Sequence, residues 1–182
     1  MRRALALIPL LMLLPACNDK PATVVQVQNS KAPGDKSYRS EDGRYSVRFP
    51  RDPSISNKEL ATPSGVLKVQ TAKVESLRDL MFSVTHVTYP PSFGEVDPTK
   101  ILDGVRDGLK GQDGELKSDK ASTTGDDNLP TRDIRIDAGK NGIRARLILV
   151  DRRLVQVMVV GAKDSLDGKP AEEFFKSLEV TK

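Results

Sequence analysis

The sequence predicts an α+β domain over residues 38–182, with a mainly antiparallel sheet and helices on both faces, in the manner of an α/β/α sandwich. Three observations lead to this prediction. Short apolar alternations of period two, separated by turn residues, indicate paired strands. Two segments with apolar residues at helical spacing indicate a central helix and a final helix. Two neighbouring runs that are apolar on both faces indicate central strands covered on either side.

The strands follow from alternation and from the residues that interrupt it. Tyr45, Val47 and Phe49 alternate with polar residues, and Pro50 ends the run. Thr62-Pro63-Ser64-Gly65 is typical of a hairpin turn. Further strands are predicted at 55–60, 66–74, 81–89, 131–137, 143–150 and 154–160, and the last two are the runs expected at the centre of the sheet.

The central helix begins after Asp97, an N-cap residue, with Pro98 at its first position. Ile101, Leu102, Val105 and Leu109 then form one apolar stripe that is expected to face a core. Gly104 and Gly108 weaken this helix, but we expect them to permit close packing. The final helix opens at 167–170, and its apolar side carries Phe174, Phe175 and Leu178.

The beginning of the chain has the pattern of a secretory signal. Arg2 and Arg3 precede about eleven mostly apolar residues, and Leu14-Pro15-Ala16 leads to Cys17, the only cysteine. Leu14–Cys17 resembles the lipobox of bacterial lipoproteins, which implies a lipid on the Cys17 sulfur and cleavage just before it. The alternative is that Cys17 is a chance thiol in a discarded peptide. Sec export is preferred to the twin-arginine route, because the longer motif of that route is missing.

The sequence thus divides into a signal peptide at 1–16, a lipidated cysteine with a flexible tether at 17–37, and the domain at 38–182. As a coil, a tether of about 20 residues would average roughly 25 Å from end to end. The expected location is the bacterial cell envelope, lipid-anchored and facing the periplasm. Asn18, rather than Asp, follows Cys17, which slightly favours the outer membrane over the inner membrane.

Charge and residue content exclude several kinds of site. The formal net charge of +4 falls to +2 without the two signal-peptide arginines, since 27 basic residues then face 25 acidic ones. Interleaved charges of this kind argue against a nucleic-acid surface. No metal site is expected, because His86 is the only histidine and Cys17 would be consumed by lipid. No phosphate-binding glycine loop occurs, and neither a cofactor nor catalytic residues are predicted.

Two groups of residues are candidates for an interaction surface. Tyr89 and Phe93 stand on a proline-stiffened loop, where exposed aromatic rings could contact a partner. Arg144 and Arg146 belong to an arginine-rich hairpin, together with Arg152 and Arg153, that could bind an anion or an acidic partner. The plainer alternatives are that the aromatic rings cap the core and that the arginines carry ordinary surface charge.

The order of several segments resembles bacterial members of the PsbP-like superfamily. These segments are GRYSVRFPRDP, TPSGVLKVQ, FSVTHVTYP, DPTKILDGVRDGLKG, GIRARLILVDRRLVQVMVVG and FFKSLEV. The superfamily includes the extrinsic photosystem II protein PsbP and the Ran-binding protein Mog. The resemblance implies an antiparallel sheet between helices, and a binding or assembly role without catalysis.

Together these observations predict a non-enzymatic lipoprotein whose domain binds an envelope protein or another ligand. The alternative is an envelope enzyme whose pocket is assembled from residues distant in sequence, around His86 or the arginines.

Overall fold

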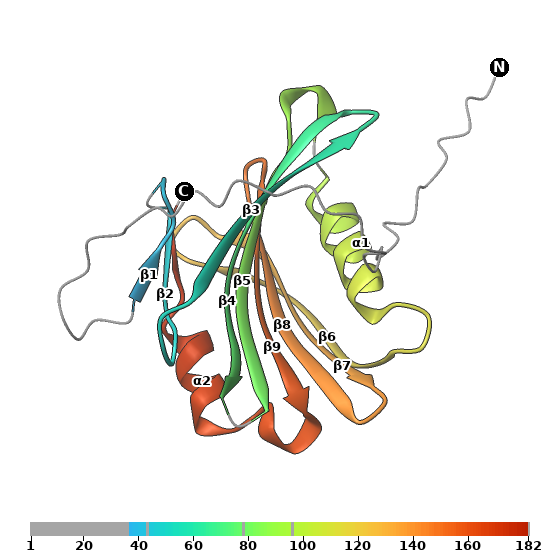
Figure 1. Ribbon diagram of the computed structural model, residues 1–182. Coiled ribbons are helices and arrows are strands. Elements are labelled where there is room, and N and C mark those ends of the chain that lie inside the picture. Colours follow the sequence, from blue (N-terminus) through green and yellow to red (C-terminus); the bar gives the residue numbers. More distant parts are fainter. Residues whose placement is uncertain (1–36, 43, 78, 96, 182) are drawn as a thin grey trace, which may run out of the picture.

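Two sheets and two α-helices make up the computed structural model, which describes residues 37–181 apart from 43, 78 and 96 (Figure 1). The elements are β1 (Ser37–Arg39), β2 (Tyr45–Arg48), β3 (Ser54–Thr62), β4 (Gly65–Leu77), β5 (Leu80–Thr88), η1 (Pro91–Phe93), α1 (Pro98–Lys110), β6 (Glu115–Thr124), β7 (Leu129–Ala138), β8 (Asn141–Val150), β9 (Arg153–Ala162), η2 (Lys163–Ser165), α2 (Lys169–Lys176) and β10 (Glu179–Val180).

The larger sheet has seven antiparallel strands in the order β3-β4-β5-β9-β8-β7-β6. Hairpin connections account for most of its neighbours, and β5 pairs with β9 across the intervening chain. The two strands predicted to be central, β8 and β9, lie in its interior. Leu147 to Val150 on β8 are all buried, since side chains on both faces of this strand are covered. The predicted α+β class with a mainly antiparallel sheet is therefore confirmed.

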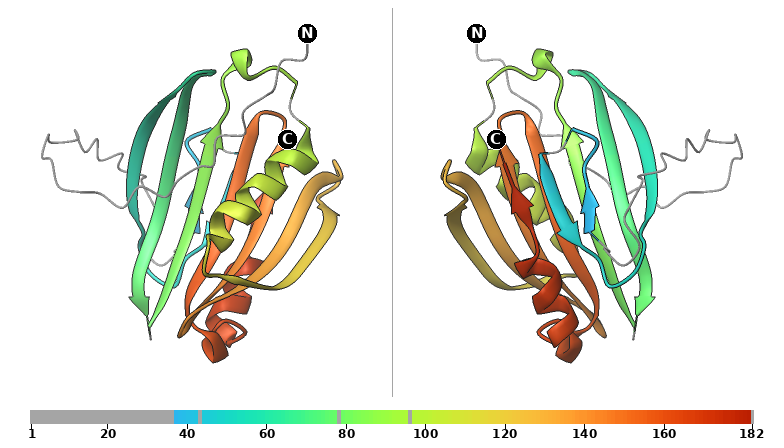
Figure 2. Two further views of the ribbon diagram at one scale, coloured as in Figure 1. Left: turned by 90° about the vertical axis from the view of Figure 1, so that its right-hand side faces the viewer. Right: turned by 90° about the vertical axis from the view of Figure 1, so that its left-hand side faces the viewer.

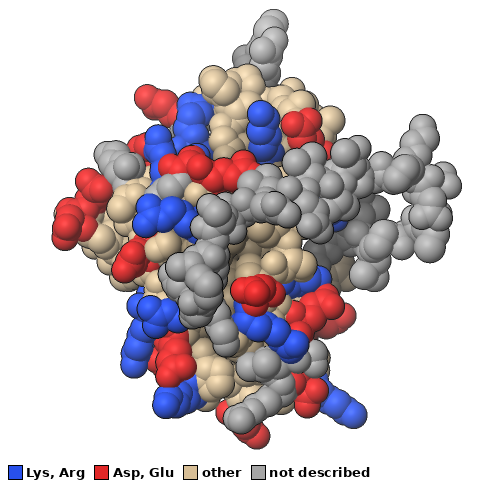
Figure 3. Space-filling model, turned by 60° about the vertical axis from the view of Figure 1, so that its left-hand side comes forward, with Lys and Arg blue, Asp and Glu red and all other residues tan. Residues whose placement is uncertain are grey.

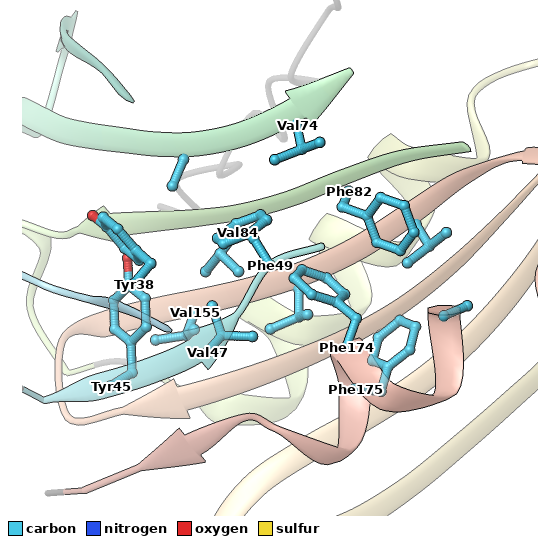
Figure 4. Close-up of a cluster of buried hydrophobic side chains, with 14 of the residues drawn as sticks. Tyr38, Tyr45, Val47, Phe49, Val74, Phe82, Val84, Val155, Phe174 and Phe175 are labelled. Carbon is cyan, nitrogen blue, oxygen red and sulfur yellow. The ribbon is translucent and has the colours of Figure 1, made fainter. Parts of the chain in front are cut away.

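One face of the large sheet packs against the small sheet β1-β2-β10 and against α2. Phe174 of α2 lies at the centre of this first core, with its ring centroid 5.0 Å from that of Phe49 and 5.3 Å from that of Phe82 (Figure 4). Since Phe49 follows β2 and Phe82 stands on β5, the ring of Phe174 joins both sheets to the final helix.

The other face carries α1, which packs on β7 and β8 (Figure 2, left). Asp97 caps this helix by accepting a hydrogen bond from the Thr99 amide at 3.0 Å, and Gly111 ends it at φ 62°. Leu102 is its buried anchor, in a second core with Ile136 and Leu147. The positions predicted for α1 and α2 are correct, except that Leu178, predicted on the final helix, lies beyond its last residue, Lys176.

The sandwich with helices on both faces is not confirmed, because the molecule is dominated by its sheets. The described chain holds two α-helices, of 13 and 8 residues. α1 covers only part of its face, and on the opposite side much of the layer is the small sheet rather than helix (Figure 2, right).

β6 is a strand that the sequence pattern did not predict. It is the edge of the large sheet, where only one neighbour is needed and polar side chains remain in water, so its sequence lacks an apolar alternation.

Among the described residues, no helix is both long enough and apolar enough to cross a membrane. The predicted signal peptide, Cys17 and the predicted tether up to residue 36 lie outside the described residues, whereas Ser37, the last residue assigned to the tether, is the first residue of β1.

Candidate interaction surface

The face of the large sheet that carries α1 is only half covered. α1 packs on β7 and β8, and Leu154 and Met158 of β9 also pack into this second core, whereas β3, β4 and β5 continue the same face beyond the helix (Figure 2, left). We refer to the α1-side face of β3, β4 and β5 as the open face. Its side chains follow from the pairing register, because residues paired across antiparallel strands point to the same side.

The end of the open face nearest the β3–β4 turn is apolar. Leu60 pairs with Leu67, and Val69 pairs with Val87. Leu60, Leu67 and Val69 belong to neither core, and Leu60 is 44% exposed. The alternation of β3 and β4 indicated which residues share a face, but it carried no sign that this face lacks a covering layer. These residues therefore could not be distinguished from core residues by their sequence pattern.

The middle of the open face is polar but uncharged. The hydroxyls of Thr71 and Thr85 lie 3.0 Å apart, and Gln156 pairs with Thr85 on the next strand. Lysines flank this region: Lys58 is paired with Val69, and Lys73 with Ser83. The open face thus combines an apolar end, a hydrogen-bonding centre and positive charge at its edge.

The Tyr89–Phe93 loop borders the apolar end. The two rings are in contact, with centroids 5.0 Å apart, and Phe93 is 37% exposed. Tyr89 packs against the second core, and burial raises the pKa of its phenol. Of the two rings predicted as interaction candidates, Tyr89 thus packs against the core, whereas Phe93 is partly exposed.

Two contacts hold this loop in place. Arg152 donates from Nη2 to the carbonyl oxygens of Pro90 and Pro91, each at 2.7 Å. Ser92 donates its hydroxyl to the carbonyl of Ser64 in the β3–β4 turn, and Gly65 lies so close that a Cβ there would be 2.9 Å from the Ser92 hydroxyl. Hydrogen bonds therefore hold the β3–β4 turn and the Tyr89–Phe93 loop together at this end of the molecule (Figure 1).

Arg144 and Arg146 lie on the opposite face of the sheet, toward α2. Arg144 donates to Glu172 at 2.5 Å and stacks its guanidinium 4.7 Å from the ring centre of Phe175. Arg146 forms a two-point ion pair with Asp133, at 2.7 and 3.1 Å. The structure therefore does not bring these arginines together with Tyr89 and Phe93, and a role in binding would require their ion pairs to open.

His86 lies at the far end of the first core. Its Nδ1 is 3.0 Å from the Tyr45 hydroxyl, and burial, followed by the charge of Arg153, lowers its pKa. In register His86 opposes Val155, whereas Arg144 opposes Val159, a separation of about 13 Å along β9. His86 and Arg144 therefore do not share one pocket.

An open hollow of about 940 Å³ lies between β1, β2 and α2. Its rim carries charges of both signs, from Arg39, Arg48, Lys176, Glu173 and Glu179. The apolar side chains beneath, such as Phe49 and Phe174, are each 1% exposed, so little apolar surface is offered to a ligand. Positive and negative side chains are likewise interspersed over the face shown in Figure 3.

Within the described part of the chain, no three His, Cys, Asp or Glu side chains gather in an arrangement that could hold a metal ion. The open face with its braced aromatic loop differs from the hollow and from the paired arginines, because it leaves apolar side chains without a covering layer. Large contiguous apolar surfaces without a covering layer are typical of interaction sites.

No protein-family model matches this chain, and no curated protein matches it. Among solved structures, the chain is similar to cyanobacterial PsbP (CyanoP) from Synechocystis sp. PCC 6803. The two share 16% identity over 86% of this chain and 98% of CyanoP, with a TM-score of 0.52. LpqN, involved in cell envelope biogenesis of Mycobacterium tuberculosis, shows 12% identity over 76% of this chain and 91% of its own, with a TM-score of 0.44. The likeness to CyanoP establishes a PsbP-like fold, as the sequence resemblance implied.

Proposed function

We propose, starting from the PsbP-like fold of the described residues, that this chain is a lipid-anchored module of the bacterial envelope that binds a protein partner and performs no catalysis. The observation that carries the proposal is the open face, where Leu60, Leu67 and Val69 are excluded from both cores. Apolar side chains on an uncovered sheet face are stabilised when a partner removes them from water.

The anchor in this proposal is Cys17. Its support is the sequence around Leu14–Cys17, and two or three acyl chains on this residue would hold the protein stably at a membrane. The same sequence supports a periplasm-facing location, and Asn18 favours the outer membrane.

Site-specific crosslinking tests partner binding. A photoreactive benzoylphenylalanine is placed at Val69, on the open face, and in a matched variant at Lys68, the next residue, on the opposite face. Irradiation in native membranes should yield one reproducible partner adduct from position 69 and none from position 68. No adduct at either position, or the same adducts at both, would contradict binding through the open face.

Mass spectrometry of the mature protein tests the lipid anchor. The Cys17→Ser chain should lack acyl groups and remain uncut or become soluble after export, whereas the unaltered chain should carry the added mass of its lipids. An identical mature mass for both chains would exclude the lipid anchor.

A further inference from the structure

We propose that the open face receives one amphipathic α-helix of the partner, with acidic residues on the polar side of that helix, lying beside α1. This inference rests on the proposed function, since it specifies the partner of the same surface. The fold already uses this arrangement on the other half of the face, where the amphipathic helix α1 covers β7 and β8.

The dimensions of the open face fit one helix. From β3 to β5 there are two strand spacings, or about 10 Å between the outer strand axes, and a helix with its side chains is about 10 Å across. Packed helices lie about 8–10 Å apart, so a second helix beside α1 would have its axis about two strands farther along, over β5. Thr85 lies on this side of β5 with Thr71 opposite it on β4, and Val69 lies opposite Val87, which also packs against the second core.

The side of α1 that borders the open face leaves room for such a neighbour. Arg106 and Asp103 contact Asp119 and Arg132 on the β6–β7 side, which fixes the rotation of the helix. At 100° per residue, Gly104 and Gly108 therefore lie on the other flank, toward the open face. A Cβ at either glycine would meet nothing within 4 Å, so the space beside this flank is unfilled.

The charged side chains of the open face indicate which residues the polar side of a bound helix should carry. On β3, β4 and β5, the α1-side positions carry Lys58 and Lys73, and Glu75 follows two residues beyond Lys73 on β4. Lys73 is paired with Glu75 at 2.5 Å, while Lys58 is exposed at the edge with no ion pair among the described residues. A helix whose flank carries Glu or Asp would complement Lys58, whereas a basic flank would be repelled.

Two synthetic peptides test the inference against the full lipidated chain in nanodiscs of neutral phosphatidylcholine. Both are fluorescein-labelled helices of about 14 residues, or about 20 Å, with the same leucine face. The polar residues are Glu in one and Lys in the other, and binding is followed by fluorescence anisotropy with empty nanodiscs as the blank. The Glu peptide should bind at least about ten-fold more tightly than the Lys peptide.

Matched charge reversals locate the binding. Lys58→Glu should weaken the Glu peptide by about three- to ten-fold, whereas Lys68→Glu, the same change on the neighbouring strand but the opposite face, should leave it unchanged. Equal binding of the two peptides, absence of binding, or equal effects of the two variants would overturn the acidic helix. An adduct at position 69 in the crosslinking experiment would then still uphold partner binding, so the two proposals fail separately.

Discussion

Replacement of Phe174 by alanine tests whether α2 joins the two sheets as the structure indicates. The side chain is 1% exposed, and its ring contacts those of Phe49, Phe82 and Phe175 at centroid distances of 5.0, 5.3 and 5.9 Å. Truncating a core phenylalanine costs about 3–5 kcal/mol, and aromatic pairs add about 0.5–1.5 kcal/mol each beyond burial. We therefore expect a loss near the upper end, about 4–5 kcal/mol.

Such a loss is a large part of the roughly 5–15 kcal/mol by which domains are stable. Urea unfolding of the chain from residue 17, with Cys17→Ser, is followed by far-ultraviolet circular dichroism. With a slope of about 2 kcal/mol per molar urea, the midpoint should fall by about 2 M. Phe93→Ala is the control, because Phe93 is 37% exposed and should cost less than about 1 kcal/mol. Equal midpoints for the two variants would refute the role assigned to Phe174.

Two further predictions concern helix α1 and pH. Gly104→Ala and Gly108→Ala should each raise the free energy of unfolding by about 0.5–1 kcal/mol in urea titrations, because alanine favours the helix and its Cβ meets open space. Gly161→Ala should lower the free energy of unfolding, because its Cβ would clash with the Asp79 carbonyl oxygen. Burial and the charge of Arg153 lower the pKa of His86 in the folded protein. Below about pH 6.5, His86 therefore becomes protonated in the unfolded chain while it is still neutral in the folded chain. Stability should fall as pH drops from about 6.5 to the folded pKa, by at most about 1.4 kcal/mol per pH unit. Urea midpoints across this range should lose that slope in His86→Phe, and an unchanged slope would assign the effect to other groups.

The helices and interior strands could be predicted because local chemistry specified them. Asp97 and Pro98 determine the start of α1, and the continuous apolar runs of β8 and β9 require cover on both faces. β6 could not be predicted in the same way, since an edge strand of charged and hydroxyl residues has the composition of a loop. Its strand character comes from pairing with β7, which is a tertiary effect.

The candidate site was only partly predictable for a similar reason. The prolines around Tyr89 and Phe93 indicated a stiff aromatic loop, and the structure shows those rings in contact. Arg144 and Arg146 were distinguished by composition, but their acidic partners are distant in sequence: Glu172 lies 28 residues from Arg144 and Asp133 lies 13 from Arg146. The position of α1 on the sheet determines which half of the face remains uncovered. This position depends on tertiary packing and cannot be inferred from a local sequence pattern.

The small sheet combines the first and the last described strands, and this affects the order in which the molecule can fold. β2 is paired on one side with β1, the first described strand, and on the other with β10, which follows every other described element. The ring of Phe174, just before β10, also enters the core late. During synthesis from the N-terminus, β2 can therefore pair with β10 only after the rest of the described chain has been made, and this long-range pairing carries a large loop-closure entropy cost. The small sheet and the core around Phe174 are therefore completed last.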